Sequence, residues 1–269
     1  MQKYVHGYTQ KEAVRLNDQA NTLDNLLHYD SLWNDGSLIL EAGCGVGSQT
    51  KIIAPKNNKS KFISIDISQD SINQAEKVIR SLKIKNVKFK QGDVFNLSFK
   101  DSYFDHVFVC FVLEHLANPL HALLELKRVL KPGGTIMVIE GDHGSAYFYP
   151  DSKAAQKAIA CQVKLQKLNS GDANIGRRLY PLLHESGFNQ ITISPRMVYV
   201  DDSKPGLVEG FTKNTFTAMI EGIAETAVSK KLIGRKEMVK GINDLYKTAD
   251  GGGTFCYTFF KGIGQKIKL

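Results

Sequence analysis

The apolar positions near the start of the chain repeat with the period of an α-helix. They are Ala13, Leu16, Ala20, Leu23 and Leu27. Steps of three and four residues place these side chains on one helical face. The segment Thr9-Gln10-Lys11-Glu12 has the capping-box pattern, in which the Thr hydroxyl and the Glu side chain bond the free amides of a helix start. Residues 1–35 are therefore predicted to form an N-terminal helical segment.

Between residues 38 and 140, short apolar or alternating runs take turns with stretches of helical period. The predicted strands are Leu38–Leu40, Lys61–Asp66, Val87–Gln91, Asp105–Val112 and Thr135–Glu140. The predicted helices run from Ser68 to Leu82 and from Asn118-Pro119, a capping residue with a first-turn proline, to the stop at Lys131-Pro132-Gly133-Gly134. This alternation predicts an α/β fold with an open, doubly wound and mostly parallel sheet.

The rhythm changes after residue 150. Helices are predicted over residues 152–168 and up to Glu185, followed by a strand over Gln190–Val200 and a last strand over Thr254–Lys261. The helical stretch between them, about residues 201–250, is predicted to be an insertion between two final strands that pair antiparallel. We expect one domain over residues 1–269, with a core over 36–150 and C-terminal strands over 151–269.

Composition places the chain among ordinary globular proteins. It has 269 residues, of which 42% are hydrophobic and 23% charged, and its longest apolar run, Val107–Leu113, is far shorter than a membrane span. The first residues do not have the charged-then-apolar order of a signal peptide. The four cysteines form no C-x-x-C pair, so we expect free thiols, no metal site and a cytoplasmic location.

The positive charge is concentrated in the second half of the chain. The net charge is +8, and residues 151–269 carry 18 Lys and Arg against 11 Asp and Glu. A basic face can meet an anionic substrate, a membrane surface or nucleic acid. It can equally be a solvated helix face, which is the more common case.

A glycine-rich loop follows the first predicted strand directly. It reads Glu41-Ala42-Gly43-Cys44-Gly45-Val46-Gly47. Glycines there let the backbone turn sharply and a ligand approach closely, and the helix that the loop opens offers free amides to a polar ligand. A tight turn without a ligand would look similar. The spacing is not the dinucleotide fingerprint, because that pattern needs its third glycine at position 48, which is Ser.

Acidic residues end the next two strands. Asp66 comes 23 residues after Gly43, close to the spacing at which a carboxylate binds ribose hydroxyls in nucleotide folds. Asp93 follows Gly92 and precedes Val94, so it can accept from an adenine amine while Val94 flanks the ring. Helix-entry or turn chemistry also explains each acid. The carboxyl ends of parallel strands meet at one edge of a sheet, where such folds bind ligands.

This ordered set of motifs resembles the class I S-adenosylmethionine-dependent methyltransferases, most closely over residues 36–141. The resemblance implies a seven-stranded sheet with an antiparallel last strand, S-adenosylmethionine as cofactor and S-adenosylhomocysteine as product. The cofactor-binding residues it implies are Glu41, Gly43, Gly45, Asp66, Ile67, Asp93, Val94, Cys110 and Phe111. By resemblance, the glycines pass along the methionine, Asp66 holds the ribose and Ile67 packs on the adenine. Cys110 and Phe111 close the methionine side, and Tyr4, Tyr8 and Arg15 reach its carboxylate from an N-terminal lid.

Methyl transfer needs a base only when the acceptor arrives protonated. Candidate bases follow the fourth strand, at Glu114 and His115, and the fifth, at Glu140, Asp142 and His143. We favour His143 as the catalytic residue, because it is expected where strand five leaves the sheet and because histidine titrates near neutral pH. A histidine that only packs its loop is the alternative. Tyr8, His115 and Tyr147 are predicted to bind the acceptor.

The sequence predicts an enzyme that methylates a small molecule. An RNA or protein methyltransferase that uses the basic C-terminal part, and a non-catalytic S-adenosylmethionine-binding protein, are the alternatives. The chain lacks the hydrolase elbow and the phosphate loop of NTPases. Nucleic acid is a less favoured partner, and the acceptor atom and the oligomeric state stay open.

Overall fold

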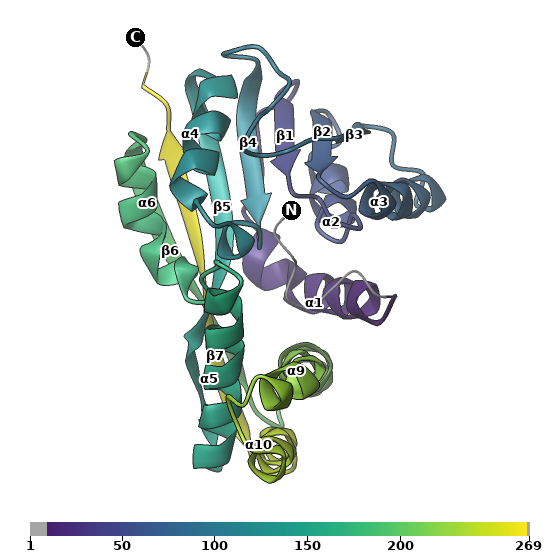
Figure 1. The fold of residues 1–269 in the computed structure, drawn as a ribbon. Helices are drawn as coiled ribbons and strands as arrows, with labels where there is room; N and C mark the ends of the chain where they lie inside the picture. The colour runs from purple at the N-terminus through teal and green to yellow at the C-terminus, as the bar shows by residue number, and fades with distance from the viewer. Residues whose placement is uncertain (1–9, 268–269) are drawn as a thin grey trace.

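Seven strands form a single sheet in the computed structural model, which describes residues 10–267 and the side chains of residues 14–267. The strand order is β3-β2-β1-β4-β5-β7-β6 (Figure 1). The first five strands in chain order are parallel, and β7 is antiparallel to both β5 and β6. The predicted α/β fold, with its mostly parallel sheet and antiparallel last pair, is confirmed.

The elements follow the predicted alternation. The strands are β1 (Leu38–Ala42), β2 (Lys61–Asp66), β3 (Val87–Gln91), β4 (Phe104–Cys110), β5 (Leu130–Tyr149), β6 (Asn189–Val200) and β7 (Thr254–Gln265). The helices are α1 (Gln10–His28), α2 (Thr50–Lys56), α3 (Gln69–Ser81), α4 (Pro119–Val129), α5 (Lys153–Leu168), α6 (Leu179–Glu185), α7 (Pro205–Leu207), α8 (Ala218–Gly222), α9 (Ala224–Ser229) and α10 (Arg235–Lys247). Two short 3-10 helices, η1 (Leu113–His115) and η2 (Ile175–Arg178), and a π-helix, η3 (Val208–Thr217), complete the described part.

Alternate side chains of the strands build two separate cores. On β4, Phe108 joins the core under α1 and α2, whereas Val107 and Val109 join the core under α4 and α6. The central strands of the sheet are therefore covered on both faces, which explains why β1 and the second half of β4 are largely apolar and buried.

The second half of the chain lengthens the sheet at one end. β5 and β7 run on beyond the parallel strands, and α5, α9 and α10 lie together along this extension (Figure 1). The four helices α7 to α10 and η3 lie between β6 and β7, which confirms the helical insertion before the last strand. The division into a single domain stays a prediction.

The fifth strand is longer than predicted. It begins at Leu130 and ends at Tyr149, so His143 lies within a strand and not in a loop that leaves it; that expectation was wrong. The reason is β7, which pairs with β5 up to Asp142 and again from Tyr147 to Tyr149, on either side of an irregularity. An antiparallel partner from the other end of the chain thus keeps the segment extended.

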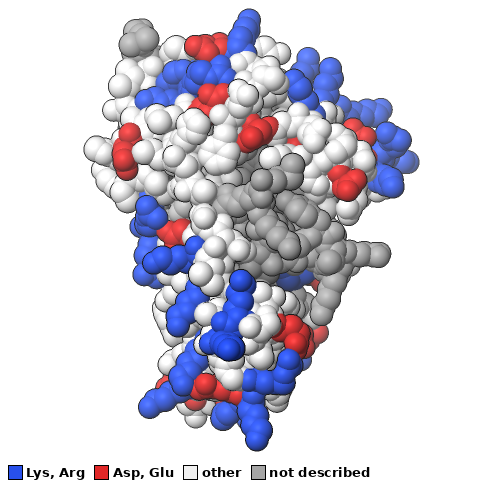
Figure 2. Space-filling view, in the orientation of Figure 1, with Lys and Arg blue, Asp and Glu red and all other residues white. Residues whose placement is uncertain are grey.

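Basic side chains are prominent on the surface of the second half of the chain, and they also cover part of the surface near β3 and α3 (Figure 2). Figure 2 shows Lys and Arg gathered over the part of the molecule where Figure 1 places α5, α9 and α10. Several of these cations have acidic partners, such as Arg235 with Glu225 and Lys157 with Glu237. None of the helices described is long and apolar enough to span a membrane.

Candidate active site

The glycine loop turns tightly against the neighbouring strands. The backbone amides of Gly43 and Cys44 both donate to the carbonyl of Ile65, at 2.8 and 2.9 Å. Gly43 has a φ of +75°, and a methyl group in place of its hydrogen would lie 2.4 Å from Cγ2 of Val112. Gly45 also has a positive φ, but open space surrounds the position of its missing Cβ. Glycine is thus required by packing at one position, and the other leaves room for a ligand.

Asp66 connects the ends of three strands. Its Oδ2 accepts from the amide of Gly45 at 2.9 Å, and its Oδ1 accepts from the amide of Ser68 at 2.9 Å. The amide of Gly92, at the end of β3, donates to the Asp66 carbonyl at 3.0 Å. Burial raises the pKa of this carboxyl, and the backbone donors oppose that shift. The loops after β1, β2 and β3 therefore converge at one edge of the sheet.

The residues beside Asp66 keep apolar surface open. Ile67 is 46% exposed, a high value for a large apolar side chain next to a buried core. Oδ1 of Asp93 accepts from the amide of Phe95 at 2.9 Å, which fixes the turn, and Val94 is half-buried. This arrangement agrees with a nucleoside site, although each residue's role stays a prediction.

Glu41 lies below the loop. It is buried, and its Oε2 accepts from the hydroxyls of Thr50 and Ser64 at 2.8 and 2.6 Å. Burial raises the pKa of Glu41 to about 7. Glu41 thus connects α2 and β2 beneath the glycine loop through these two hydrogen bonds. Its contact with the cofactor stays a prediction.

The end of β4 carries backbone strain. Phe111 has a φ of +58° while its amide donates to the carbonyl of Ile139 at 2.9 Å. A bulky residue in this region is uncommon and is held there by its surroundings. The preceding Cys110 is buried, which raises the pKa of its thiol well above the ordinary value, so the thiol is protonated and unreactive at neutral pH.

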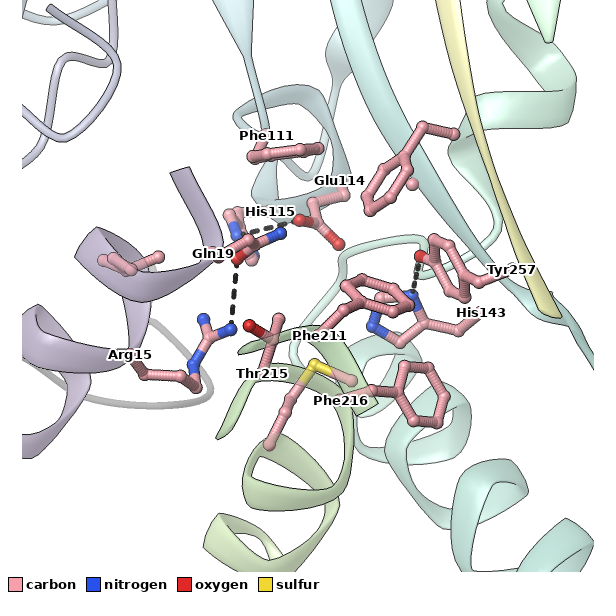
Figure 3. A pocket seen from close by; sticks show the side chains of 14 residues that line it. Arg15, Gln19, Phe111, Glu114, His115, His143, Phe211, Thr215, Phe216 and Tyr257 are labelled. Carbon is pink, nitrogen blue, oxygen red and sulfur yellow. Dashed lines mark hydrogen bonds and ion pairs between the residues drawn. The ribbon is translucent and has the colours of Figure 1, made fainter. Parts of the chain in front are cut away.

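A small cavity opens beside this strained segment. It has a volume of about 60 Å³, room for about two water molecules. Side chains from the strand ends, α1 and η3 surround it (Figure 3). The lining residues are Arg15, Leu16, Gln19, Phe111, Glu114, His115, Gly141, His143, Phe211, Thr215, Phe216, Met219, Tyr257 and Phe259. The predicted N-terminal segment and the helical insertion thus both contribute to its walls.

His143 and Tyr257 form a buried pair in the cavity wall. Nδ1 of His143 lies 2.8 Å from the hydroxyl of Tyr257, and the two residues are 7% and 2% exposed. Burial lowers the pKa of His143 and raises that of Tyr257 well above its ordinary value. Both groups are therefore neutral at pH 7. Nothing local in the sequence predicts this pair, although the alternation of Phe255, Tyr257 and Phe259 in the last strand is a pattern that places Tyr257 on the buried face.

Two glutamates take different positions next to the cavity. Glu114 lines it, with Oε2 accepting from Nε2 of Gln166 at 3.0 Å and Oε1 lying 3.4 Å from Nε2 of His115. Glu140 is fully buried, and its Oε1 accepts from the amides of Val112 and Leu113 at 3.0 and 2.7 Å. Burial raises its pKa well above the ordinary range. Glu140 therefore holds the start of η1 in place and is not a solvent-facing base.

Of the remaining predicted residues, some line the cavity and others lie away from it. His115 and Arg15 line the cavity. Asp142 is buried, and both of its carboxylate oxygens accept hydrogen bonds from the guanidinium of Arg177. This bidentate ion pair gives Asp142 a structural role. Tyr147 is 60% exposed on the outer part of β5 and does not line the cavity, because strand alternation turns it to the opposite face from buried Phe148. Tyr4 and Tyr8 lie outside the described residues. Among the residues that are described, no side-chain cluster could hold a metal ion.

Comparison with known proteins identifies relatives over most of the chain. The chain is 31% identical over 229 residues to an uncharacterized 37.1 kDa protein in a transposon of Streptomyces fradiae, which covers 82% of this chain and 65% of that protein. It is 35% identical over 147 residues to an uncharacterized methyltransferase of Schizosaccharomyces pombe, covering 52% of each. The chain thus spans between half and two thirds of the length of these curated relatives.

A solved structure and a family model agree with these matches. The structure of Haemonchus contortus phosphoethanolamine N-methyltransferase 2, in complex with phosphomonomethylethanolamine and S-adenosylhomocysteine, shares the fold with a TM-score of 0.60 at 15% identity, covering 96% of this chain and 58% of that one. A family model described as a methyltransferase domain matches residues 34–187, more than half of the chain. The chain therefore belongs to the family of class I S-adenosylmethionine-dependent methyltransferases, enzymes whose cofactor is S-adenosylmethionine.

Proposed function

We propose that this protein transfers the methyl group of S-adenosylmethionine to a small molecule whose reacting end enters the cavity beside Phe111. One observation carries the proposal. Val112 packs against Gly43 of the glycine loop, and the residue before it, Phe111, lines the cavity. A single two-residue segment therefore separates the cofactor-side loop from the cavity. A methionine moiety along the glycine loop lies next to this segment, as direct methyl transfer requires.

The residues at the strand ends fit the cofactor. Open space at Gly45 admits the backbone side of a ligand, Asp66 offers carboxylate oxygens to ribose hydroxyls, and exposed Ile67 offers an apolar surface to adenine. When bound, the cofactor supplies an activated methyl group. The protein's own contribution is to align the acceptor and to exclude water from a site roofed by apolar side chains.

The character of the cavity supports a small acceptor. Phenylalanine, leucine and methionine supply six of its 14 lining residues, and seven others carry polar groups: Arg15, Gln19, Glu114, His115, His143, Thr215 and Tyr257 (Figure 3). Walls that combine apolar surface with placed polar groups are typical of small-molecule sites. The Haemonchus structure described above also contains a small molecule, phosphomonomethylethanolamine, beside S-adenosylhomocysteine.

Ligand-induced thermal stabilisation tests the cofactor part of the proposal. S-adenosylmethionine and S-adenosylhomocysteine should each raise the melting temperature, whereas NAD should leave it unchanged. A failure of both adenosyl ligands to stabilise the protein would overturn the proposal. The acceptor is then sought by incubating the enzyme and labelled S-adenosylmethionine with a metabolite extract and reading the mass shift of the product.

The basic surface favours one second candidate, methylation of RNA or protein. The Lys and Arg residues over α5, α9 and α10 give that face its charge (Figure 2). If nucleic acid binds there, its affinity must fall steeply as salt concentration rises. Label that appears in the macromolecular fraction would support this candidate, and a flat salt response would remove its RNA version. Cofactor binding without any labelled product would instead favour a non-catalytic binding protein.

A further inference from the structure

The hydrogen bond between Tyr257 and His143 restricts where His143 can carry its proton. A neutral imidazole has one N–H and one lone pair, so one ring nitrogen donates and the other accepts. Nδ1 is the nitrogen that faces the Tyr257 hydroxyl, at 2.8 Å. In Figure 3 the other nitrogen points away from Tyr257, and within residues 14–267 no hydrogen bond to Nε2 is formed.

The buried hydroxyl of Tyr257 decides between the two tautomers. If Nδ1 carried the proton, it would donate to the phenol oxygen, and the phenol O–H would then need another acceptor. Among the described residues, Nδ1 of His143 is the acceptor within hydrogen-bond distance of this hydroxyl. Because an unpaired buried O–H is costly, the hydroxyl donates to Nδ1.

The charges around His143 keep the ring neutral. Burial is the largest effect and lowers its pKa, and Arg15 and His115 act in the same direction. The carboxylates Glu114 and Asp142 oppose that shift. Burial outweighs them, so His143 stays uncharged at neutral pH with its proton on Nε2.

We propose that Tyr257 is a positioning residue that holds His143 as the Nε2–H tautomer, so that His143 donates a hydrogen bond to the methyl acceptor and Glu114 takes the acceptor's proton. The proposal rests on the proposed function. It replaces the expectation that His143 is the base, because in this tautomer the lone pair at Nδ1 is occupied and Nε2 has none to offer. Glu114 lines the same cavity; its Oε2 accepts from Gln166, and its Oε1, 3.4 Å from Nε2 of His115, is the oxygen that takes the proton.

The proton and electron balance of the transfer is simple. A lone pair of the acceptor atom forms the new bond to the methyl carbon, and the carbon–sulfur bond breaks with its electron pair staying on sulfur. The acceptor's proton passes to the Glu114 carboxylate and from there to solvent. The acceptor class that fits is a small molecule with a hydroxyl or amine as the reacting group, a nearby atom that accepts from Nε2, and an apolar part that packs against the phenylalanines of the wall.

The tautomer can be measured directly, without turnover. The two ring nitrogens of a neutral histidine have well-separated ¹⁵N shifts, so a histidine-labelled sample, with and without S-adenosylhomocysteine, reports which one carries the proton. The expected result is a proton on Nε2 of His143 in the wild type, and a mixture of tautomers in Tyr257→Phe. Tyr147→Phe is the matched control, because Tyr147 is exposed on the same strand pair; it should leave the His143 signals unchanged. A proton on Nδ1 in the wild type overturns the proposal, even if Tyr257→Phe fails to fold.

Turnover then tests the two roles separately. The readout is S-adenosylhomocysteine produced from the metabolite extract. His143→Gln keeps an N–H donor near the position of Nε2 but cannot act as a base, so it should retain activity within about threefold, whereas His143→Leu and Glu114→Gln should each lose more than tenfold. Equal loss in His143→Gln and His143→Leu would refute the donor role. If even the wild type makes no product, the proposed function fails, while the nitrogen shifts still decide the tautomer.

Discussion

Gly210 of η3 lies in direct contact with Thr22 of α1. A methyl group in place of the glycine hydrogen would stand 2.3 Å from Oγ1 of Thr22 and 3.0 Å from its Cγ2. The N-terminal helix and the insertion before the last strand are thus joined at a point where no side chain fits. Both elements supply cavity walls, Arg15 and Leu16 from α1 and Phe211 from η3, so this contact sets the position of the cavity's roof.

We therefore expect Gly210→Ala to displace the roof. Thr22 is β-branched and has few rotamers to escape into, so the added methyl group forces the two helices apart. Overpacking of this kind destabilises by about 1–3 kcal/mol. Urea unfolding should show that loss, and production of S-adenosylhomocysteine from the extract should fall with it.

Two further variants distinguish the loss of the Gly210–Thr22 contact from the effect of placing alanine in a helix. Gly222→Ala, in α8, meets nothing within 4 Å and should be neutral or slightly stabilising. Thr22→Ala removes Oγ1 and Cγ2, so Gly210→Ala/Thr22→Ala should recover part of the stability that Gly210→Ala loses. Strict additivity of the two changes would show that the contact does not carry the effect.

Gly43 and Gly36 give a second comparison, because both glycines have a positive φ. Gly43 and Gly36 have φ values of +75° and +81°, so alanine is strained at either position by about 1–2 kcal/mol. Gly43→Ala also meets Val112 at 2.4 Å, whereas Gly36→Ala meets nothing within 4 Å. We expect both variants to lose stability. Gly43→Ala alone should also lose more than tenfold in affinity for S-adenosylhomocysteine, because Val112 and the loop must separate.

Calorimetric titration of Gly43→Ala and Gly36→Ala with S-adenosylhomocysteine measures the two affinities. Unchanged affinity in Gly43→Ala would mean that the loop and the segment after β4 bind the ligand independently of each other. Val112→Ala in the Gly43→Ala background is the check, since it removes the two methyl groups nearest to the added one and should restore part of the binding.

The parts of the fold that were predicted correctly are those specified by local sequence. Ser68 caps α3, and Asn118 caps α4 with Pro119 at its first turn, as the capping rules state. The parallel order of the first strands follows from their alternation with helices along the chain. The convergence of Gly45, Asp66 and Gly92 could be predicted because all three lie at carboxyl ends of neighbouring parallel strands.

The parts that were missed depend on residues far apart in the sequence. The pair between His143 and Tyr257 spans 114 positions, and it exists because β7 continues to pair with β5 past Glu140. Tyr147 was assigned to the acceptor site on the assumption of a loop, but in a strand its side chain must alternate with buried Phe148. No local pattern in residues 140–149 distinguishes these two cases without the partner strand.

Glu41 gives the wild-type protein a specific pH dependence. Its pKa in the folded state is about 7, above the ordinary value of 4.5. Between these values the folded protein holds a proton on Glu41 that the unfolded chain has lost, so this group lowers the free energy of unfolding as pH rises from 4.5 to 7. The difference corresponds to about 3 kcal/mol. The contribution is fully present below pH 4.5 and is lost above about pH 7.

Glu41→Gln should remove this slope. Gln keeps an acceptor oxygen for Thr50 and Ser64 but does not titrate. Urea unfolding at pH 5 and pH 8 should show that the variant's stability relative to the wild type rises by about 3 kcal/mol at the higher pH. A relative stability that is the same at both pH values would contradict the position assigned to Glu41. The variant must be compared with the wild type at each pH, because His28 also titrates in the wild type. Burial lowers the pKa of His28 to about 4, so this group raises the free energy of unfolding as pH rises from about 4 to 6.5, opposite to the effect of Glu41.

Asp30 holds two buried cations from the far end of the chain. Its Oδ1 accepts from Nζ of Lys261 at 2.6 Å and its Oδ2 from Arg196. Lys261 and Arg196 are only 1% and 7% exposed. The end of α1 is thereby tied to β7 and β6, the strands that bracket the insertion.

The two sides of this cluster should respond differently to substitution. Asp30→Asn leaves two buried cations without a counter-charge, which typically costs about 3–5 kcal/mol, with the low end expected because Asp30 itself is about a third exposed. Lys261→Met removes a buried charge and replaces it with an apolar chain of similar length, while Asp30 keeps Arg196; such replacements are often close to neutral. We therefore expect Asp30→Asn to be the far more destabilising change in urea unfolding. Asp30→Asn/Lys261→Met should then be more stable than Asp30→Asn alone, since the second substitution removes one of the stranded charges. Equal losses for the two single variants would mean that Lys261 is held by its bonds to the Leu27 carbonyl and the Ser31 hydroxyl and that the charge of Asp30 contributes little.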